Sequence, residues 1–283
     1  MGWAGVIGLN LTPPQRDALI RTLVSPDHTV GARAWLLDLE HNTIADLSSH
    51  LVSGQVNIDA SADVTRQLQN FVLADPGNEL GVDTVEGAPR LNRMVRVYYT
   101  VLVEELEDWV GIPLFTGPIT RVDRSEGQVS IEAMGKEHLA MNPLWRSRKY
   151  SRNSKKVDVI ASIMRDLSGE THLALPGGWS AALGKDLSIS KEMSAWPIVK
   201  DIAEGMGTQL YYDGRGHLQQ RKRPVRPYFT FKDGDGGSVT NLDSLQEYAG
   251  DIVNTVEVIG GTPQGKSSPL TARAYLPAVH PHS

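Results

Sequence analysis

The 283-residue sequence contains no cysteine. Disulfide bridges, thiolate catalysis and cysteine-ligated zinc sites are therefore excluded for this chain. No apolar run approaches the roughly 20 residues that span a membrane as a helix. The opening residues MGWAGVIGLNLTPPQ lack the positive segment and cleavage site of a secretory signal, so we expect no signal peptide and no membrane span.

Aromatic residues are also scarce, at 6% of the chain, whereas glycine (27) and proline (16) are frequent. Helical periodicity is confined to short segments separated by turn residues. This combination predicts a mainly β protein with a small α+β middle module.

Charge is unevenly distributed along the chain. The net charge is −5, but residues 29–145 carry 8 basic and 17 acidic side chains, whereas residues 146–228 carry 15 basic and 8 acidic ones. An asymmetry of this size indicates parts that face different partners or each other.

Strand patterns dominate the first half. Residues 51–60 and 64–74 read as long strands, and residues 109–117, 119–123 and 128–134 supply further ones. Two later strands are predicted at residues 228–231 and 253–259. In the segment Arg93–Leu106 apolar residues alternate with others over the whole length, which predicts one buried face and one that is exposed or faces another chain. Long strands at turn-punctuated intervals favour a closed or nearly closed antiparallel barrel.

Three short helices are predicted. The first begins at Thr12, a cap residue followed by two prolines, and we expect it to pack on its own domain or, less often, on a neighbouring subunit. The second covers about residues 157–167 and stops at Gly169. The third begins after Ser194, ends at Gly205 and Gly207, and leads into a hairpin over residues 209–221 with an Asp-Gly turn.

This last stretch, IAEGMGTQLYYDGRGHLQQRKRP, resembles the middle of the tail-hub and baseplate-hub proteins of long-tailed bacteriophages. GQVNIDASADVTRQLQNFVLADP resembles a segment of minor tail proteins from phages that infect actinobacteria. VRVYYTV and PLFTGPITRVDRSEGQVSIEAMGKEHLA resemble the barrel core of the hub family. The segments occur in the family's order and cover most of residues 45–260.

The resemblance implies a virion structural protein of the tail tip, made in the host cytoplasm. It implies a ring, usually a homotrimer, of subunits with two barrel-like domains that form part of the DNA channel or its plug. The implied partners are the distal tail protein, the tape-measure protein and tail fibres or receptor-binding proteins. No enzymatic activity, cofactor or metal is implied.

The sequence divides into five predicted segments. They are an N-terminal helical arm (1–28), a first β-barrel domain (29–145), a two-helix middle module (146–207), a hairpin with a second, short β domain (208–261) and an extended C-terminal arm (262–283).

Candidate catalytic groups are weak. Ser180 lacks the second glycine of a nucleophile elbow, and Ser188 with Lys191 matches Ser-x-x-Lys without companion motifs. Neighbouring acids at Glu104–Asp108 could form a glycosidase-like pair, although acids on a hairpin tip usually keep the tip solvated.

Candidate metal ligands are equally weak. His41 and His50 are too far apart for a helix-borne pair, and His280 and His282 lie in the terminal tail. The run Asp233–Gly237 lacks the distal glutamate of a calcium loop and is interpreted as a turn.

The basic stretch Trp145–Lys156 and the later run Arg221–Arg223 suit either phosphate neutralisation or a subunit interface. Because the whole chain is acidic and no nucleic-acid motif accompanies them, we favour an interface with an acidic partner over sequence-specific nucleic-acid binding. The predicted interface residues are Arg146, Arg148, Lys149, Arg152, Lys155, Lys156, Arg221, Lys222 and Arg223 on the basic side, and Glu104, Glu105, Glu107 and Asp108 on the acidic side.

Two other functions remain open from the sequence. A distal tail ring protein would share a related barrel but form hexamers. A tail-associated enzyme that degrades the cell wall would turn over peptidoglycan.

Overall fold

The structure is a computed structural model, and it describes residues 11–60, 62–80, 88–125, 127–176, 181–222, 255–259 and 271–275. Contacts divide the chain into two compact units, Met1–Arg223 and Pro224–Ser283. No helix among the described residues is long and apolar enough to cross a membrane.

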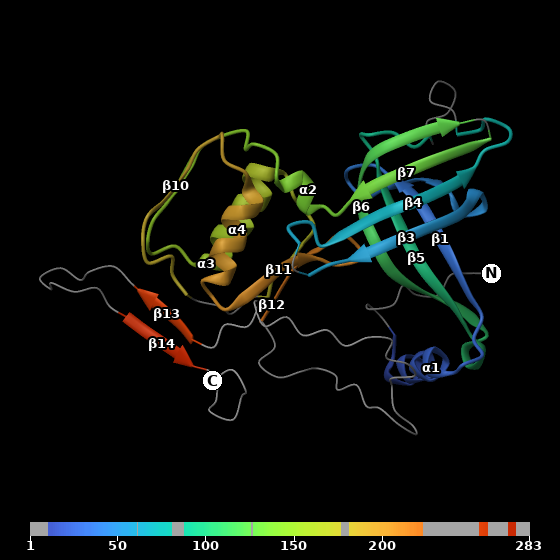
Figure 1. Ribbon diagram of the computed structural model, residues 1–283, viewed down its shortest axis with the longest axis horizontal. Coiled ribbons are helices and arrows are strands. Elements are labelled where there is room, and N and C mark those ends of the chain that lie inside the picture. Colours follow the sequence, from blue (N-terminus) through green and yellow to red (C-terminus); the bar gives the residue numbers. More distant parts are fainter. Residues whose placement is uncertain are drawn as a thin grey trace, which may run out of the picture. The chain divides into compact units, whose positions relative to one another are not determined.

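A seven-stranded antiparallel sheet forms the larger part of the first unit (Figure 1). Its spatial order is β2-β1-β5-β6-β7-β4-β3. The strands are β1 (Val30–Leu37), β2 (Thr43–Asp46), β3 (Leu51–Ile58), β4 (Arg66–Ala74), β5 (Met94–Val103), β6 (Asp108–Ser125) and β7 (Gln128–Met134). Single-turn helices η1 (Ser48–His50) and η2 (Glu104–Leu106) precede β3 and follow β5.

Strand β6 is shared by both halves of this sheet. It pairs with β5 along Asp108–Pro118 and with β7 along Ile119–Ser125. The sequence predicted two strands here, because Gly117-Pro118 reads as a break. The strand instead continues, and Gly117 is required because a Cβ at this position would collide with the carbonyl oxygen of Met134.

The sequence predicted a closed or nearly closed barrel, and the described strands do not form a closed one. The two ends of the sheet, β2 and β3, form no ladder with each other, so the sheet is open. The sheet instead curves around an apolar core to which β1, β4, β5, β6 and β7 all contribute. The fold class is therefore mainly β, with a curved open sheet.

The face of β5 that was predicted to be exposed or to face another chain is partly covered by this chain itself. Tyr98 and Thr100, expected on the open face, are both nearly fully buried. Tyr98 meets the edge of the Trp35 ring at 4.8 Å. Farther along the same face, Arg96 donates to the carbonyl oxygen of Arg215 at 3.2 Å. A later part of the same chain thus covers the face that the sequence left open.

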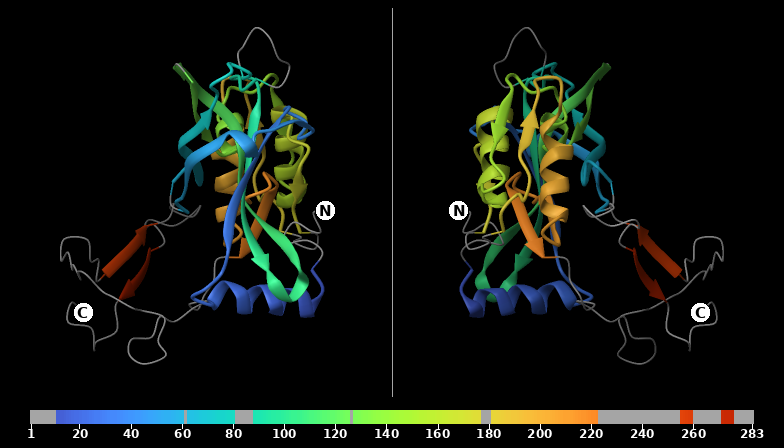
Figure 2. Two further views of the ribbon diagram at one scale, coloured as in Figure 1. Left: turned by 90° about the vertical axis from the view of Figure 1, so that its right-hand side faces the viewer. Right: turned by 90° about the vertical axis from the view of Figure 1, so that its left-hand side faces the viewer.

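Helix α1 (Pro13–Val24) begins as predicted, and the side chain of Gln15 accepts a hydrogen bond from the backbone N–H of Thr12 at 3.0 Å. Ala18 and Leu19 are buried against Val101 and Val103 of β5. The helix therefore packs on its own chain, across the end of the β5–β6 hairpin (Figure 2).

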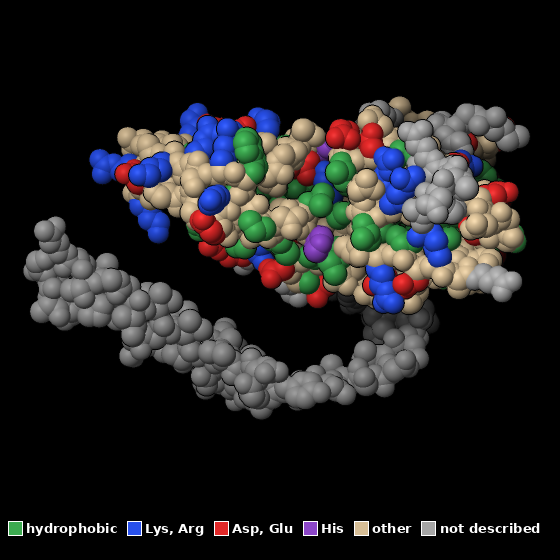
Figure 3. Space-filling view, turned by 90° about the horizontal axis from the view of Figure 1, so that it is seen from above, with side chains coloured by type: hydrophobic (Ala, Val, Ile, Leu, Met, Phe, Trp, Pro, Cys, Tyr) green, Lys and Arg blue, Asp and Glu red, His purple; other side chains and the backbone are tan. Residues whose placement is uncertain are grey.

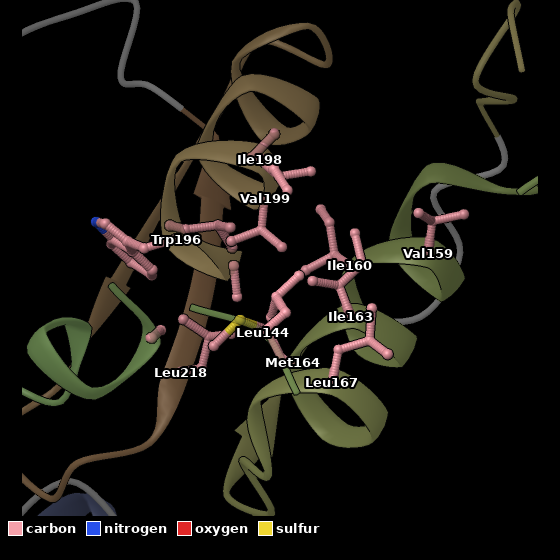
Figure 4. Close-up of a cluster of buried hydrophobic side chains, with 14 of the residues drawn as sticks. Leu144, Val159, Ile160, Ile163, Met164, Leu167, Trp196, Ile198, Val199 and Leu218 are labelled. Atoms are coloured by element: carbon pink, nitrogen blue, oxygen red, sulfur yellow. The ribbon is translucent and has the colours of Figure 1, made fainter. Parts of the chain in front are cut away.

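A second core lies between two helical segments. Helix α3 (Lys156–Ser162) continues into a π-helical turn, η3 (Ile163–Leu167), and α4 (Ala195–Glu204) packs against both. Figure 4 shows Ile160, Ile163 and Met164 facing Val199 of α4. The predicted helix stops are confirmed at Gly169 and Gly207, which have φ of +80° and +67° in the left-handed region.

Trp196 joins the second core to the large sheet. Its ring is buried, and Nε1 donates to the carbonyl oxygen of Asp63, in the loop before β4, at 2.9 Å. Lys200, one turn later in α4, pairs with the Asp63 carboxylate at 2.8 Å.

Small sheets surround the second core. The predicted hairpin is confirmed as β11 (Thr208–Tyr212) and β12 (Leu218–Lys222), and β12 also pairs in parallel with β9 (Leu173–Ala174). Strand β8 (Arg148–Tyr150) pairs with β10 (Leu187–Ile189). A short helix, α2 (Glu137–Ala140), follows β7.

In the second unit, β13 (Thr255–Ile259) pairs antiparallel with β14 (Thr271–Tyr275). The strand predicted near residue 255 is confirmed. The segment from Thr262, predicted as an extended arm, contains β14. The strand predicted at residues 228–231 lies outside the described residues.

Candidate functional site

The predicted basic surface follows β8 and the start of α3, and most of its side chains are exposed. Arg148 pairs with Asp166, whereas Lys156 is half-buried and donates to the carbonyl oxygen of Gly205 at 3.0 Å. Figure 3 shows Lys and Arg side chains gathered at the end of the first unit that carries α3 and β10 in Figure 1. This end of the unit is positively charged.

Arg221 and Lys222 lie at the end of β12 and are exposed. The Arg221 guanidinium lies over the ring of Tyr211 at 4.7 Å. Arg223 lies outside the described residues. No contact joins these residues to the β8 surface within the described part of the chain.

The predicted acidic residues form the turn between β5 and β6, where Glu107 has a left-handed φ of +52°. Glu104 and Glu105 are exposed. The Glu105 carboxylate pairs with Arg21 of α1 at 2.6 Å, and this hydrogen bond lowers the pKa of Glu105. A general acid needs the opposite shift, so Glu105 does not suit that role.

The remaining sequence candidates do not form a site in the described chain. Ser188 lies on β10 and Lys191 lies in the turn that follows, so the two do not form the helical Ser-x-x-Lys arrangement. His50 is engaged with the carbonyl oxygen of Ala74 at 2.9 Å. Ser180, Asp233–Gly237, His280 and His282 lie outside the described residues.

One group of titratable side chains in the described chain was not predicted. Three stacked imidazoles, a lysine and a glutamate meet where the large sheet contacts the second core. We call this group the histidine junction; its members are His41, His172, His217, Lys136 and Glu170. The rings of His41 and His172 stack at 3.7 Å with 7° between their planes, and His172 and His217 follow at 5.5 Å and 10°.

Three separate turns bring these histidines together, and an acidic side chain supports each. In the turn after β1, Asp38 accepts from the backbone N–H of Asn42 at 2.8 Å, and His41 has a left-handed φ of +71°. The N–H of His172 donates to Glu170 at 2.7 Å. The N–H of His217 donates to Asp213 at 3.0 Å.

Gly216 makes the close approach possible. Its φ is +76°, and a Cβ there would lie 3.0 Å from the Lys136 side chain and 3.1 Å from the His41 ring. The same hairpin turn presses Gly214 onto β6, where a Cβ would collide with the carbonyl oxygen of Pro113. Glycine at these two positions lets the turn reach the sheet.

The ion pair of the junction is almost fully buried. Nζ of Lys136 lies 2.7 and 2.9 Å from the two carboxylate oxygens of Glu170 and 3.0 Å from Nε2 of His41. Tyr212 donates its hydroxyl to Glu170 at 3.0 Å. Burial lowers the pKa of Lys136 and raises that of Tyr212 well above its usual value.

His41 is held between two basic groups. Its Nδ1 lies 3.1 Å from the guanidinium of Arg96 and its Nε2 lies 3.0 Å from Nζ of Lys136. Both neighbours are hydrogen-bond donors, so a neutral imidazole accepts from only one of them. Burial, with Lys136 and His172 next in effect, lowers the pKa of His41 to about 2. Burial also lowers the pKa values of His172 and His217. The three imidazoles are therefore neutral at physiological pH.

A metal ion does not fit this stack, although ring nitrogens of the three histidines lie within 4.8 Å of one another. The lone pair of an imidazole lies in its ring plane, and three nearly parallel, separated planes have no common point for an ion. Lys136 and Arg96 also occupy both nitrogens of His41. The junction is therefore a neutral, hydrogen-bonded contact between two parts of one chain.

No family model matches the chain, and no curated protein matches it. Solved structures do. A tail protein from Neisseria meningitidis MC58 superposes with a TM-score of 0.56 at 15% identity, covering 88% of this chain and 68% of that one. A 43 kDa tail protein of prophage MuSo2 from Shewanella oneidensis superposes with a TM-score of 0.55 at 10% identity, covering 87% and 69%.

The chain has the fold of phage tail proteins. This agrees with the resemblance found in the sequence at the level of fold, and it extends over the sheet and the second core rather than over isolated segments. At these identities the tail-protein fold is what the comparison shows.

Proposed function

We propose that this chain is a structural protein of a bacteriophage tail, placed at the tail tip as the hub that joins the tube to the host-recognition apparatus. The observation that carries the proposal is the tail-protein fold over 88% of the chain. The hub segments quoted from the sequence, and their resemblance to proteins of phages that infect actinobacteria, support the finer assignment. The working parts of such a protein are surfaces.

The proposed partners follow from that role. They are further copies of this chain in a ring, most simply a trimer, the distal tail protein and the tape-measure protein, together with fibres or receptor-binding proteins. The ring would form part of the DNA channel or its plug. The protein would be made in the host cytoplasm and end in the virion.

Opposite charges on separate parts of the first unit support a ring. The acidic β5–β6 turn lies beside α1, whereas the basic β8 surface lies near α3, away from it (Figure 1). Two complementary surfaces that do not overlap join identical subunits head to tail, and such a contact closes into a ring if the rotation allows it. Glu104, Glu107 and Asp108 form no ion pair within the described residues and are available for that contact.

Native mass at several concentrations, measured by light scattering, tests the assembly. A trimer supports the hub. A hexamer supports a distal tail ring instead. If the protein is a monomer at every concentration, labelled protein should be located on intact tails, and a position away from the tip contradicts the proposal.

A charge exchange tests the contact itself. One variant carries Lys149, Arg152 and Lys155 reversed to Glu, and the other carries Glu104, Glu107 and Asp108 reversed to Lys. Each variant alone should remain folded but fail to assemble. A mixture of the two should form assemblies in which the two variants alternate. An alternating ring closes only with an even number of subunits, so a wild-type trimer predicts open chains and a hexamer predicts closed rings. Wild-type assembly by either variant alone contradicts the contact.

The run Arg221–Arg223 is tested separately. Reversing these three residues to Glu should impair assembly and leave the circular dichroism of the monomer unchanged. Normal assembly would remove them from the proposed interface.

A further inference from the structure

A pocket of about 330 Å³ opens where the chain leaving α2 passes the end of η3. The turn after β1 contributes Leu39, the segment after α2 contributes Leu144 and Trp145, and the end of β11 contributes Tyr212. The volume lies within the range of about 300–1,000 Å³ that is typical of ligand pockets. We call it the Trp145 pocket.

Most of the surface that lines this pocket is apolar, although Lys136, Glu170, Asn142, Ser168 and Thr171 also contribute to it. Leu144, Leu167 and Tyr212 belong to the buried second core, and Figure 4 shows Leu144 and Leu167 within that cluster. At the mouth, Leu39 is 50% exposed and Trp145 is 66% exposed. Two large apolar side chains beside an apolar hollow leave surface in water that a partner would cover favourably.

The buried polar side chains that line the pocket are already satisfied. Lys136 contacts Glu170 and His41, and the Tyr212 hydroxyl donates to Glu170. Among the described residues, buried side-chain atoms without a partner occur at Arg93, Glu137 and Gln220, and none of these residues lines the pocket. A polar group inserted here would lose its hydrogen bonds to water without replacement, so the inserted end of an occupant is apolar.

The surroundings of the mouth are positive. The guanidinium of Arg146 lies over the Trp145 ring at 4.2 Å, and its other described contact is the carbonyl oxygen of Asp166 at 3.3 Å. Lys149 and Arg152 continue the same stretch and form no ion pair with an acid in the described part of the chain. Charge complementarity therefore selects an acidic partner.

The geometry points to a docking site for an acidic protein segment, which inserts one large apolar side chain between Leu39 and Trp145 while its carboxylates meet Arg146 and the β8 surface. A protein segment fits better than a nucleic acid. An exposed tryptophan could stack on a base, but the buried part of the lining offers no unpartnered donor to a base edge or phosphate. The site stands whether or not the chain forms a tail-tip ring.

Selection of short random peptides on the full-length protein tests the site without assuming a sequence. The enriched peptides should carry Leu, Phe or Trp flanked by Asp or Glu. Fluorescence anisotropy with one such peptide should show at least about tenfold weaker binding to Trp145→Ala and to Arg146→Glu, because a central aromatic anchor and its charged neighbour dominate small interfaces. Both residues are exposed, so the variants should fold.

Matched control variants distinguish binding at this site from non-specific binding to exposed apolar or charged side chains. Leu91→Ala removes another exposed apolar side chain, and Arg16→Glu makes the same charge change on α1; neither should alter binding. The inference is overturned if no peptide is enriched on the wild-type protein relative to the Trp145→Ala protein, or if the enriched peptides lack acidic residues. It is also overturned if a selected peptide binds the wild type and Trp145→Ala with equal affinity. Displacement of the peptide by oligothymidylate at the same site would assign the pocket to nucleic acid and equally overturn it.

Discussion

Acidification should weaken the contact between the large sheet and the second core through His41. The pKa of His41 is about 2 in the folded protein, whereas its ordinary value, which applies to the unfolded chain, is 6.5. Between pH 6.5 and about pH 2, His41 is protonated in the unfolded chain but not in the folded protein. The free energy of unfolding is therefore at its full value above pH 6.5 and decreases as the pH falls below 6.5. A proton on His41 would place a third positive charge between Lys136 and Arg96.

The magnitude follows from the distance to pH 6.5. At about pH 5 the difference is about 1.5 pH units, which is about 2 kcal/mol for a fully shielded group at 1.36 kcal/mol per unit. His41 keeps partial access to solvent, and screening reduces the expected loss to about 1 kcal/mol. His172 and His217 add losses of the same sign, because burial lowers their pKa values too.

Urea denaturation followed by tryptophan fluorescence, from about pH 8 to about pH 5, measures the effect. His41→Asn removes the titrating ring, so its stability should change less than that of the wild type over this range. His28→Asn, outside the junction, should behave like the wild type. The wild type and His41→Asn share all other charged groups that face the stack or lie near it, so the pH dependence of those groups cancels in the comparison. These groups are Lys136, Glu170, Arg96, Arg215, Asp213 and Glu137. Equal losses in wild type and His41→Asn would refute the reasoning.

Three further predictions concern single positions. Burial raises the pKa of Glu137, so its cost is present at high pH and disappears as the carboxyl protonates; Glu137→Gln should be more stable than wild type by about 1 kcal/mol at pH 8 and equal to it near pH 4, as measured by urea midpoints. Trp196→Phe should cost about 1–3 kcal/mol, because the carbonyl of Asp63 loses its donor and a cavity forms, and a melting temperature unchanged from wild type would contradict this. Gly214→Ala should lower the free energy of unfolding by about 3 kcal/mol, because the added Cβ collides with Pro113. Gly127 has open space around it and a φ of +75°, so Gly127→Ala should lower the free energy of unfolding by only about 1 kcal/mol. Equal melting temperatures for the two variants would contradict the collision at Gly214.

Elements with a local pattern were predictable from the sequence. Strand β7, helix α4 and the β11–β12 hairpin lie where alternation, a cap residue and an Asp-Gly turn placed them. Their boundaries depend on neighbours in the chain, which the sequence displays directly. Gly117-Pro118 misled the prediction, because glycine there serves close contact with β7 rather than a turn.

The histidine junction could not be predicted because its members have no common period or spacing. His41, His172 and His217 lie in three turns that only the packing of the second core against the sheet brings together. The sequence did contain one common feature of the three histidines. Each lies two to four residues after an acidic residue whose carboxylate accepts a backbone hydrogen bond within the same turn; these residues are Asp38, Glu170 and Asp213. Such acidic residues are common in turns, so this feature alone would not select these three histidines.

The continuity of β6 also sets an order of folding. Strands β5, β6 and β7 follow one another with short turns, so their ladders close small loops and form at little entropic cost. Strand β1 must find β5 more than fifty residues away, and β4 must find β7 across a similar gap. The three-stranded meander is therefore the natural nucleus, and mutations within β6 should slow folding, whereas those in β1 should mainly speed unfolding.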